Sequence, residues 1–171
     1  MTGFVSIDDD SALSGRVQSD GVVDQRVSVG DYADDTDSCG FLSFPLSTAG
    51  IPAGATVTSA TLTIYQQTVT GTPYTDLGGR LVVDDTSYTA LSMSVYQASF
   101  VNPTTMSSDA STGSKAATVT PLVAPDVSKN AATSQFRLCF PLRTDGNKDQ
   151  DFVLIPTGST NKAKLTINYS Y

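Results

Sequence analysis

The feature that most constrains this chain is a two-residue alternation of side-chain character over residues 56–65. The even-numbered positions include Leu62 and Ile64, whereas the odd-numbered positions carry mainly Ser, Thr and Val. Successive side chains of a strand point to opposite faces, and β-branched residues favour strands. This segment therefore predicts a half-buried β-strand with Leu62 and Ile64 facing the core.

The same pattern recurs along the chain between clusters of turn residues. Further strands are expected at 4–7, 16–18, 26–29, 39–46, 80–84, 135–140, 151–155 and 164–169. Gly, Pro, Asn and Asp gather at 51–54, 71–73, 78–79 and 144–147, where turns or loops are expected. One short helix is expected over 121–132, with Thr120 as its N-cap and Pro121 at its first position.

About eight to ten short strands with almost no helix indicate an all-β fold. We expect residues 1–171 to form one antiparallel β-sandwich of jelly-roll type with at most one short helix. Within it, residues 1–26 supply N-terminal strands or an arm, and residues 102–116 form an exposed loop rich in Ser and Thr.

Composition excludes several classes of function. The chain has no His, no Trp and no Glu, and its net charge is −7. Without His, neither a Ser-His-Asp triad nor a His-ligated zinc site can form. The acidic balance argues against nucleic-acid binding, and no apolar run is long enough to insert into a membrane. We expect a non-enzyme, since the best acidic pair, Asp84 and Asp85, points to opposite faces of a strand.

The N-terminal segment Met1–Asp10 has no basic region followed by an apolar one, so no signal peptide is expected in it. The composition, rich in Ser, Thr, Gly and Asp, is nevertheless typical of exported β-proteins. Two origins fit these observations: a domain of a secreted protein, or a protein made in the cytosol that works outside it, such as a virion protein. Both predict an extracellular, virion or cell-surface location.

Four segments follow one another in a recognisable order: Gly40–Phe44, Ile51–Tyr65, Ser134–Leu138 and Ala163–Tyr169. Together they resemble DNRLRE-type domains, and the best match is IPAGATVTSATLTIY at residues 51–65. These domains are jelly-roll-like modules of secreted and cell-surface microbial proteins, and some bind acidic polysaccharides. The resemblance, which covers about residues 27–171, implies a non-catalytic module and makes polysaccharide a candidate partner.

Oxygen-bearing side chains alternate in the segment DGNKDQD, at Asp145, Asn147, Asp149 and Asp151. A tight loop with this spacing can turn carboxylates and an amide toward one hard cation, as calcium requires. The loop is not an EF-hand, because Gln150 and Pro156 stand where that motif has Gly and Glu. We expect either a weak calcium site, with a Kd of about 10⁻⁴–10⁻³ M, or an ordinary solvated loop.

Two other acidic clusters allow the same two interpretations. One is Asp8–Asp10, and the other comprises Asp31, Asp34, Asp35 and Asp37 around Tyr32. Each can lie beside a cation, or can be a solvated loop that keeps the protein soluble and protects a sheet edge.

The two cysteines, Cys39 and Cys139, both fall in expected strands, on the face opposite the core residues. Matching faces allow a disulfide between neighbouring strands, which in the chain-entropy model adds about 4–5 kcal/mol of stability for a loop of about 100 residues. The alternative is two free thiols, as in a reducing cytosol.

Sugar binding by a module of this kind needs an aromatic ring or a guanidinium group at the surface. Tyr74 and Tyr88 lie in or near expected loops, and Arg80 can contact an acidic glycan. The competing interpretation is that the tyrosines are buried with their hydroxyls bonded. Arg137 is a further candidate, although we expect it to be an ordinary exposed strand residue.

Two functions follow from these observations. The first is a structural surface module, a subunit or decoration of an extracellular assembly such as a virion or filament. It is expected to self-associate, or to dock on a larger protein assembly, through an exposed strand edge or a terminus. The alternative is a carbohydrate-binding or adhesion module of a secreted protein.

Overall fold

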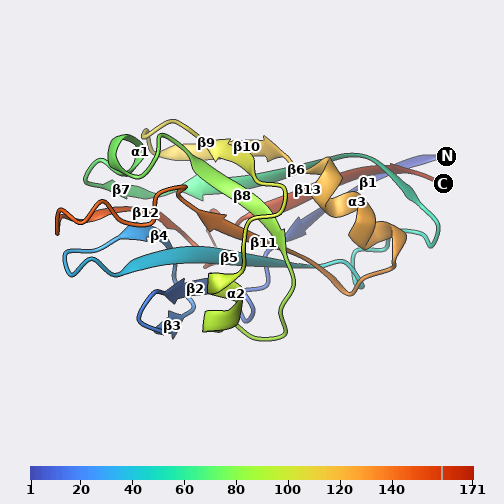
Figure 1. Ribbon diagram of the computed structural model, residues 1–171. Coiled ribbons are helices and arrows are strands. Elements are labelled where there is room, and N and C mark those ends of the chain that lie inside the picture. Colours follow the sequence, from blue (N-terminus) through green and yellow to red (C-terminus); the bar gives the residue numbers. More distant parts are fainter. Residues whose placement is uncertain (159) are drawn as a thin grey trace.

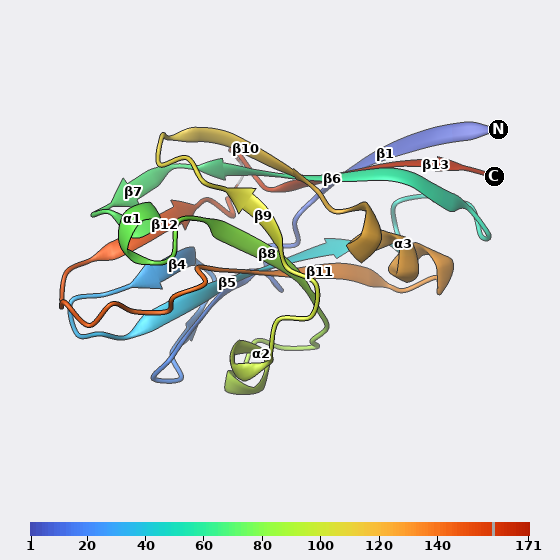
Figure 2. The ribbon, with the colours of Figure 1, turned by 45° about the horizontal axis from the view of Figure 1, so that its top comes forward.

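Two antiparallel sheets face each other in the computed structural model, which describes residues 1–158 and 160–171 (Figures 1 and 2). The first sheet has the order β1 (Thr2–Asp8), β13 (Lys164–Ser170), β6 (Thr56–Gln66) and β10 (Gly113–Thr118). The strands of the second sheet fall between these in the sequence, so the chain crosses repeatedly from one sheet to the other. The predicted antiparallel β-sandwich is confirmed.

The second sheet carries the remaining strands. Its order is β7 (Thr68–Thr70), β12 (Asp151–Ile155), β4 (Val27–Asp31), β5 (Asp37–Pro45), β11 (Thr133–Cys139), β8 (Leu81–Thr86) and β9 (Thr104–Ser107). A short hairpin of β2 (Gly15–Gln18) and β3 (Val23–Asp24) is attached to it, because β2 also pairs with β5.

The main core lies between the two sheets and confirms the alternation seen in the sequence. On β6, Leu62 and Ile64 are buried in this core, and on β5 so are Leu42 and Phe44. Each of these side chains leaves water when the sheets pack, which stabilises the fold by roughly 1.5–3 kcal/mol per large apolar side chain.

A smaller apolar cluster covers the other face of the second sheet. It contains Phe41, Tyr88, Tyr96 and the two cysteines, and residues around α2 (Met93–Gln97) pack against it. Cys39 and Cys139 form a disulfide here, across the adjacent strands β5 and β11, with their Cα atoms 4.8 Å apart.

The structure has three short helices where at most one was expected, so that part of the prediction is wrong. The expected helix exists as α3 (Thr120–Ser128), but it ends before Asn130, whose φ of 52° is left-handed. The other two, α1 (Pro73–Asp76) and α2, are single turns. Helices this short contain too few residues to show a 3.6-residue period. None of the helices in the described part of the chain is long and apolar enough to span a membrane.

The expected exposed loop at residues 102–116 is right only at 102–103 and 108–112, because the segment also contains β9 and most of β10. Its few inward-facing residues account for the difference: Met106 is buried, and so is Lys115, whose Nζ donates to Asp109 Oδ2 at 2.6 Å. A lysine that faces inward and pairs with an aspartate cannot be recognised from the sequence as a buried residue.

Of the two forms expected for residues 1–26, strands or an arm, the structure shows strands. β1 pairs along its whole length with β13, and the two chain ends lie side by side at one end of the sandwich (Figure 1). The amino group of Met1 donates to the carbonyl oxygen of Tyr171 at 2.6 Å. The opposite end carries α1 and the loop between β11 and β12 (Figure 1).

Candidate cation site and exposed edge strand

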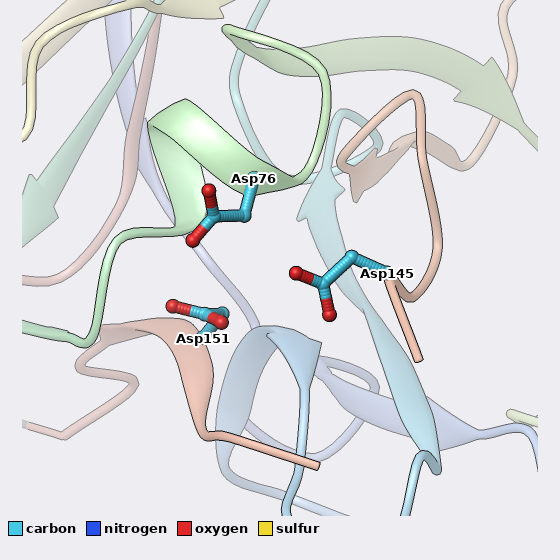
Figure 3. A group of neighbouring side chains, drawn as sticks. All are labelled: Asp76, Asp145 and Asp151. Atoms are coloured by element: carbon cyan, nitrogen blue, oxygen red, sulfur yellow. The ribbon is translucent and has the colours of Figure 1, made fainter. Parts of the chain in front are cut away.

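Three aspartates from separate segments point toward one another at the end of the sandwich remote from the termini (Figure 3). Asp76 ends α1, Asp145 lies in the loop between β11 and β12, and Asp151 is the first residue of β12. One carboxylate oxygen from each lies within 4.8 Å of the other two. Oxygens no farther apart than about twice a calcium–oxygen bond can all contact one ion.

A fourth aspartate, Asp31, adjoins this group. It is the last residue of β4 and lies directly opposite Asp151 in the β4–β12 ladder. Its Oδ2 accepts the backbone N–H of Asp145 at 3.3 Å. Burial raises the pKa of the Asp31 carboxyl above its ordinary value, and the nearby negative charges of Asp145 and Asp151 add to the rise.

A glycine brings the segment before α1 against the site. Gly71 has a φ of 66°, and a Cβ there would lie 2.1 Å from the carbonyl oxygen of Gln150 and 2.2 Å from Asp151 Oδ1. Only glycine allows this approach. As a result, the backbone N–H of Thr72 donates to Asp151 Oδ1 at 2.5 Å, and the Thr72 hydroxyl donates to Asp76.

Two carboxylate oxygens of the group have no hydrogen-bond partner in the described chain. They are Oδ1 of Asp31 and Oδ2 of Asp151, and each residue is only 1% exposed. None of the salt bridges among residues 1–158 and 160–171 involves Asp31, Asp76, Asp145 or Asp151. The three clustered acids and the adjoining Asp31 therefore have no ion-paired cationic side chain in the described part of the chain.

The structure brings together two of the four ligands expected from the loop spacing. Asp145 and Asp151 belong to the group, whereas Asn147 and Asp149 are exposed and bond within the loop. The Asn147 amide donates to Asp145 Oδ2 at 2.8 Å, and the N–H of Asp149 donates to Asn147 Oδ1 at 2.6 Å. Asp31 was expected in a different acidic cluster and Asp76 was not a candidate, because only the pairing of β4 with β12 and the position of α1 bring them near Asp151.

The other acidic clusters are dispersed. Asp8 pairs with Lys164 at 2.6 Å, and Asp37 accepts the Tyr96 hydroxyl at 2.6 Å and lies 3.4 Å from Arg143. Asp9 is buried with neither carboxylate oxygen bonded, and this burial raises its pKa to about 6. Asp34 is bonded to Thr36, and this hydrogen bonding lowers the pKa of Asp34.

Arg137 is not the exposed strand residue that was expected, since it is 1% exposed. Its guanidinium lies 3.6 Å from Asp84 and stacks over the ring of Phe100 at 4.4 Å. Both oxygens of Asp84 also accept backbone N–H groups, from Val101 and Asn102. Asp85, by contrast, is exposed. The two acids considered as an enzymatic pair thus lie in different surroundings.

The residues considered for sugar binding are also separated by the fold. Tyr74 is buried with its hydroxyl donating to Gln66 Oε1 at 2.6 Å, and Tyr88 is buried with its hydroxyl donating to Leu13 O at 3.0 Å. Arg80 is exposed. The structure therefore offers no exposed ring face at Tyr74 or Tyr88 beside which Arg80 could hold a sugar.

A second notable feature lies at the other end of the sandwich, where β1 forms one edge of the first sheet. Its inward side chains Val5 and Ile7 pack on the core, and its outward Phe4 is 71% exposed. Met1 and Tyr171, beside it, are exposed as well. The free edge of β1 thus combines unpaired backbone groups with apolar surface.

Comparison with known proteins adds no family to these observations. No family model matches the chain, and a search of curated proteins finds no similar sequence. The resemblance to DNRLRE-type domains stays a prediction.

Proposed function

We propose that this chain is a non-catalytic structural module of an extracellular or surface assembly, and that it assembles by pairing β1 with β1 of a second copy. The observation that carries the proposal is the unprotected edge of β1. Natural edge strands are usually blunted by Lys, Pro, a bulge or a covering segment. β1 has no Lys and no Pro, and it pairs with β13 without a bulge.

The opposite edge of the same sheet is formed by β10, and this edge is protected against pairing. β10 carries the inward-pointing, salt-bridged Lys115, and such a buried charge opposes pairing with a further strand. The difference between the two edges of this sheet favours association through β1 rather than through β10.

The sequence of β1 suits pairing with itself. In an antiparallel pair centred on Val5, Phe4 lies opposite Ser6 of the copy, and Asp8 lies opposite Thr2. The two Asp8 carboxylates, the only charged side chains of β1, then lie at opposite ends of the pair. The two Phe4 rings become diagonal neighbours on one face, within reach of each other. Two four-stranded sheets would join into one continuous sheet.

The other elements of the proposal rest on separate observations. The Cys39–Cys139 disulfide supports a location outside the reducing cytosol, because such bonds persist in oxidising compartments. A non-catalytic role is supported by Asp84 and Arg137, which pair with each other and hydrogen-bond to the backbone.

Light scattering on the purified chain tests the proposal. The wild-type protein is expected to show a concentration-dependent mass rising to twice the 17.9 kDa of one chain. Phe4→Asp is expected to return it to the monomer mass, since the substitution places like charges near each other in the pair. Val101→Asp is the matched control, because Val101 is 73% exposed and lies away from β1.

A wild-type protein that stays monomeric at every concentration would overturn the proposal. So would a dimer that Val101→Asp disrupts as strongly as Phe4→Asp. A monomer that bound a glycan on an array would instead place the chain among carbohydrate-binding modules.

A further inference from the structure

We propose that Asp76, Asp145 and Asp151, with Asp31 adjoining them, form a calcium site that fastens the loop between β11 and β12 to α1 and to the start of β12. The site lies at the end of the sandwich opposite the termini, so its test is independent of the assembly through β1 (Figure 1).

The first argument is the state of the buried oxygens. A buried polar atom without a partner destabilises the folded state, and an ionised one does so more strongly. Oδ1 of Asp31 and Oδ2 of Asp151 are two such atoms, on acids that face each other across one ladder. In each carboxylate the other oxygen accepts a backbone N–H, from Asp145 and Thr72 respectively. These bonds fix each carboxylate in place and leave one oxygen for a ligand.

The second argument is charge. The three clustered carboxylates and the adjoining Asp31 carry up to four negative charges, and no salt bridge in the described part of the chain neutralises any of them. A divalent cation between Asp76, Asp145 and Asp151 reduces this repulsion. The positive charge that would balance these carboxylates is therefore not supplied by a side chain of the described chain, and a bound cation can supply it.

The third argument identifies the ion. Calcium takes six to eight oxygen ligands at about 2.3–2.6 Å in flexible geometry, and carboxylates can bind it through one or both oxygens. The oxygens of Asp76, Asp145 and Asp151 lie within 4.8 Å of one another, which suits an ion of that size. Magnesium demands a tighter octahedron at about 2.0–2.1 Å and gives up its water reluctantly. Calcium is thus the better fit.

Thermal unfolding in EDTA and in calcium chloride tests the site. At a calcium concentration about 100-fold above the Kd, the Tm of the wild-type protein is expected to rise by about 5–10 °C. Magnesium chloride at the same concentration is expected to have a smaller effect. Limited proteolysis is expected to show slower cleavage between residues 141 and 150 when calcium is present.

Matched variants separate this site from the loop spacing alone. Asp151→Asn is expected to abolish the calcium response and Asp31→Asn to weaken it, whereas Asp149→Asn, which removes one negative charge from the loop between β11 and β12, is expected to keep it. In EDTA, Asp151→Asn is expected to unfold at a higher temperature than the wild type, because a buried unpartnered charge is gone. Asp76→Asn, at a less buried position, supplies the same test if a core variant does not fold.

Two results would overturn the proposal. One is a wild-type Tm that calcium does not change. The other is an Asp149→Asn variant that loses the response while Asp31→Asn and Asp151→Asn retain it.

Discussion

Removing the disulfide between Cys39 and Cys139 is expected to lower the free energy of unfolding by about 4–5 kcal/mol. The two residues are separated by 100 positions in the sequence. In the chain-entropy model, a cross-link of this span removes about 16 cal/mol/K from the unfolded chain, or about 4.7 kcal/mol at 25 °C. The folded state changes little, because β5 and β11 remain paired through their backbones from Thr133 to Leu138.

The expected change in Tm follows from the chain length. An unfolding entropy of about 2.1 cal/mol/K per residue gives about 360 cal/mol/K for this chain, so 4.7 kcal/mol corresponds to a Tm lower by about 13 °C. Calorimetry and urea unfolding of Cys39→Ala/Cys139→Ala measure it. The reduced wild-type protein is the control, since it loses the bond but keeps both sulfur atoms in the apolar cluster under α2.

A loss below about 1 kcal/mol in both the double variant and the reduced protein would refute this reasoning. It would mean that the unfolded chain already holds β5 and β11 near each other. A large loss in the double variant alone would instead assign the effect to packing of the sulfur atoms.

Three further predictions concern single residues. Burial raises the pKa of Asp9 to about 6. Between about pH 4 and pH 6, the Asp9 carboxyl therefore keeps its proton in the folded state but has lost it in the unfolded state. Stability is therefore expected to fall by up to about 3 kcal/mol as pH rises from about 4 to about 6, and urea unfolding of Asp9→Asn should show a smaller fall. Asp84→Ala is expected to cost about 3–5 kcal/mol in urea unfolding, because it leaves Arg137 buried and unpaired; a loss like that of a surface substitution would contradict this. Gly30→Ala is expected to lower the Tm, since its Cβ would lie 2.0 Å from the carbonyl oxygen of Asp151 at a φ of 133°; an unchanged Tm would show that the ladder can shift there.

The fold could be predicted from the sequence wherever the signal is local. The alternation that ends in Leu62 and Ile64 depends only on neighbouring residues, and it located β6 and its buried face. β9 and β10 have few apolar residues at their inward positions, and β10 has Lys115 there, so their sequence does not predict strands. α1 and α2 are too short to show a 3.6-residue period in the sequence.

Only part of the candidate cation site can be predicted from the sequence. Asp145 and Asp151 are close together in the sequence, so their alternating pattern predicts a common site. Asp31 and Asp76 reach the site through the β4–β12 ladder and the close approach at Gly71, which are properties of the folded chain. Burial of Arg137 was likewise missed, because its partner Asp84 lies on a neighbouring strand.

The pairing of β1 with a second copy is tested most directly by amide hydrogen exchange at low and high protein concentration. In an isolated edge strand, alternate N–H groups face water and exchange quickly. The account predicts that amides within Thr2–Asp8 become protected as concentration rises, and that Phe4→Asp prevents this protection. Exchange in β1 that does not depend on concentration, or protection that appears on another element instead, would contradict it.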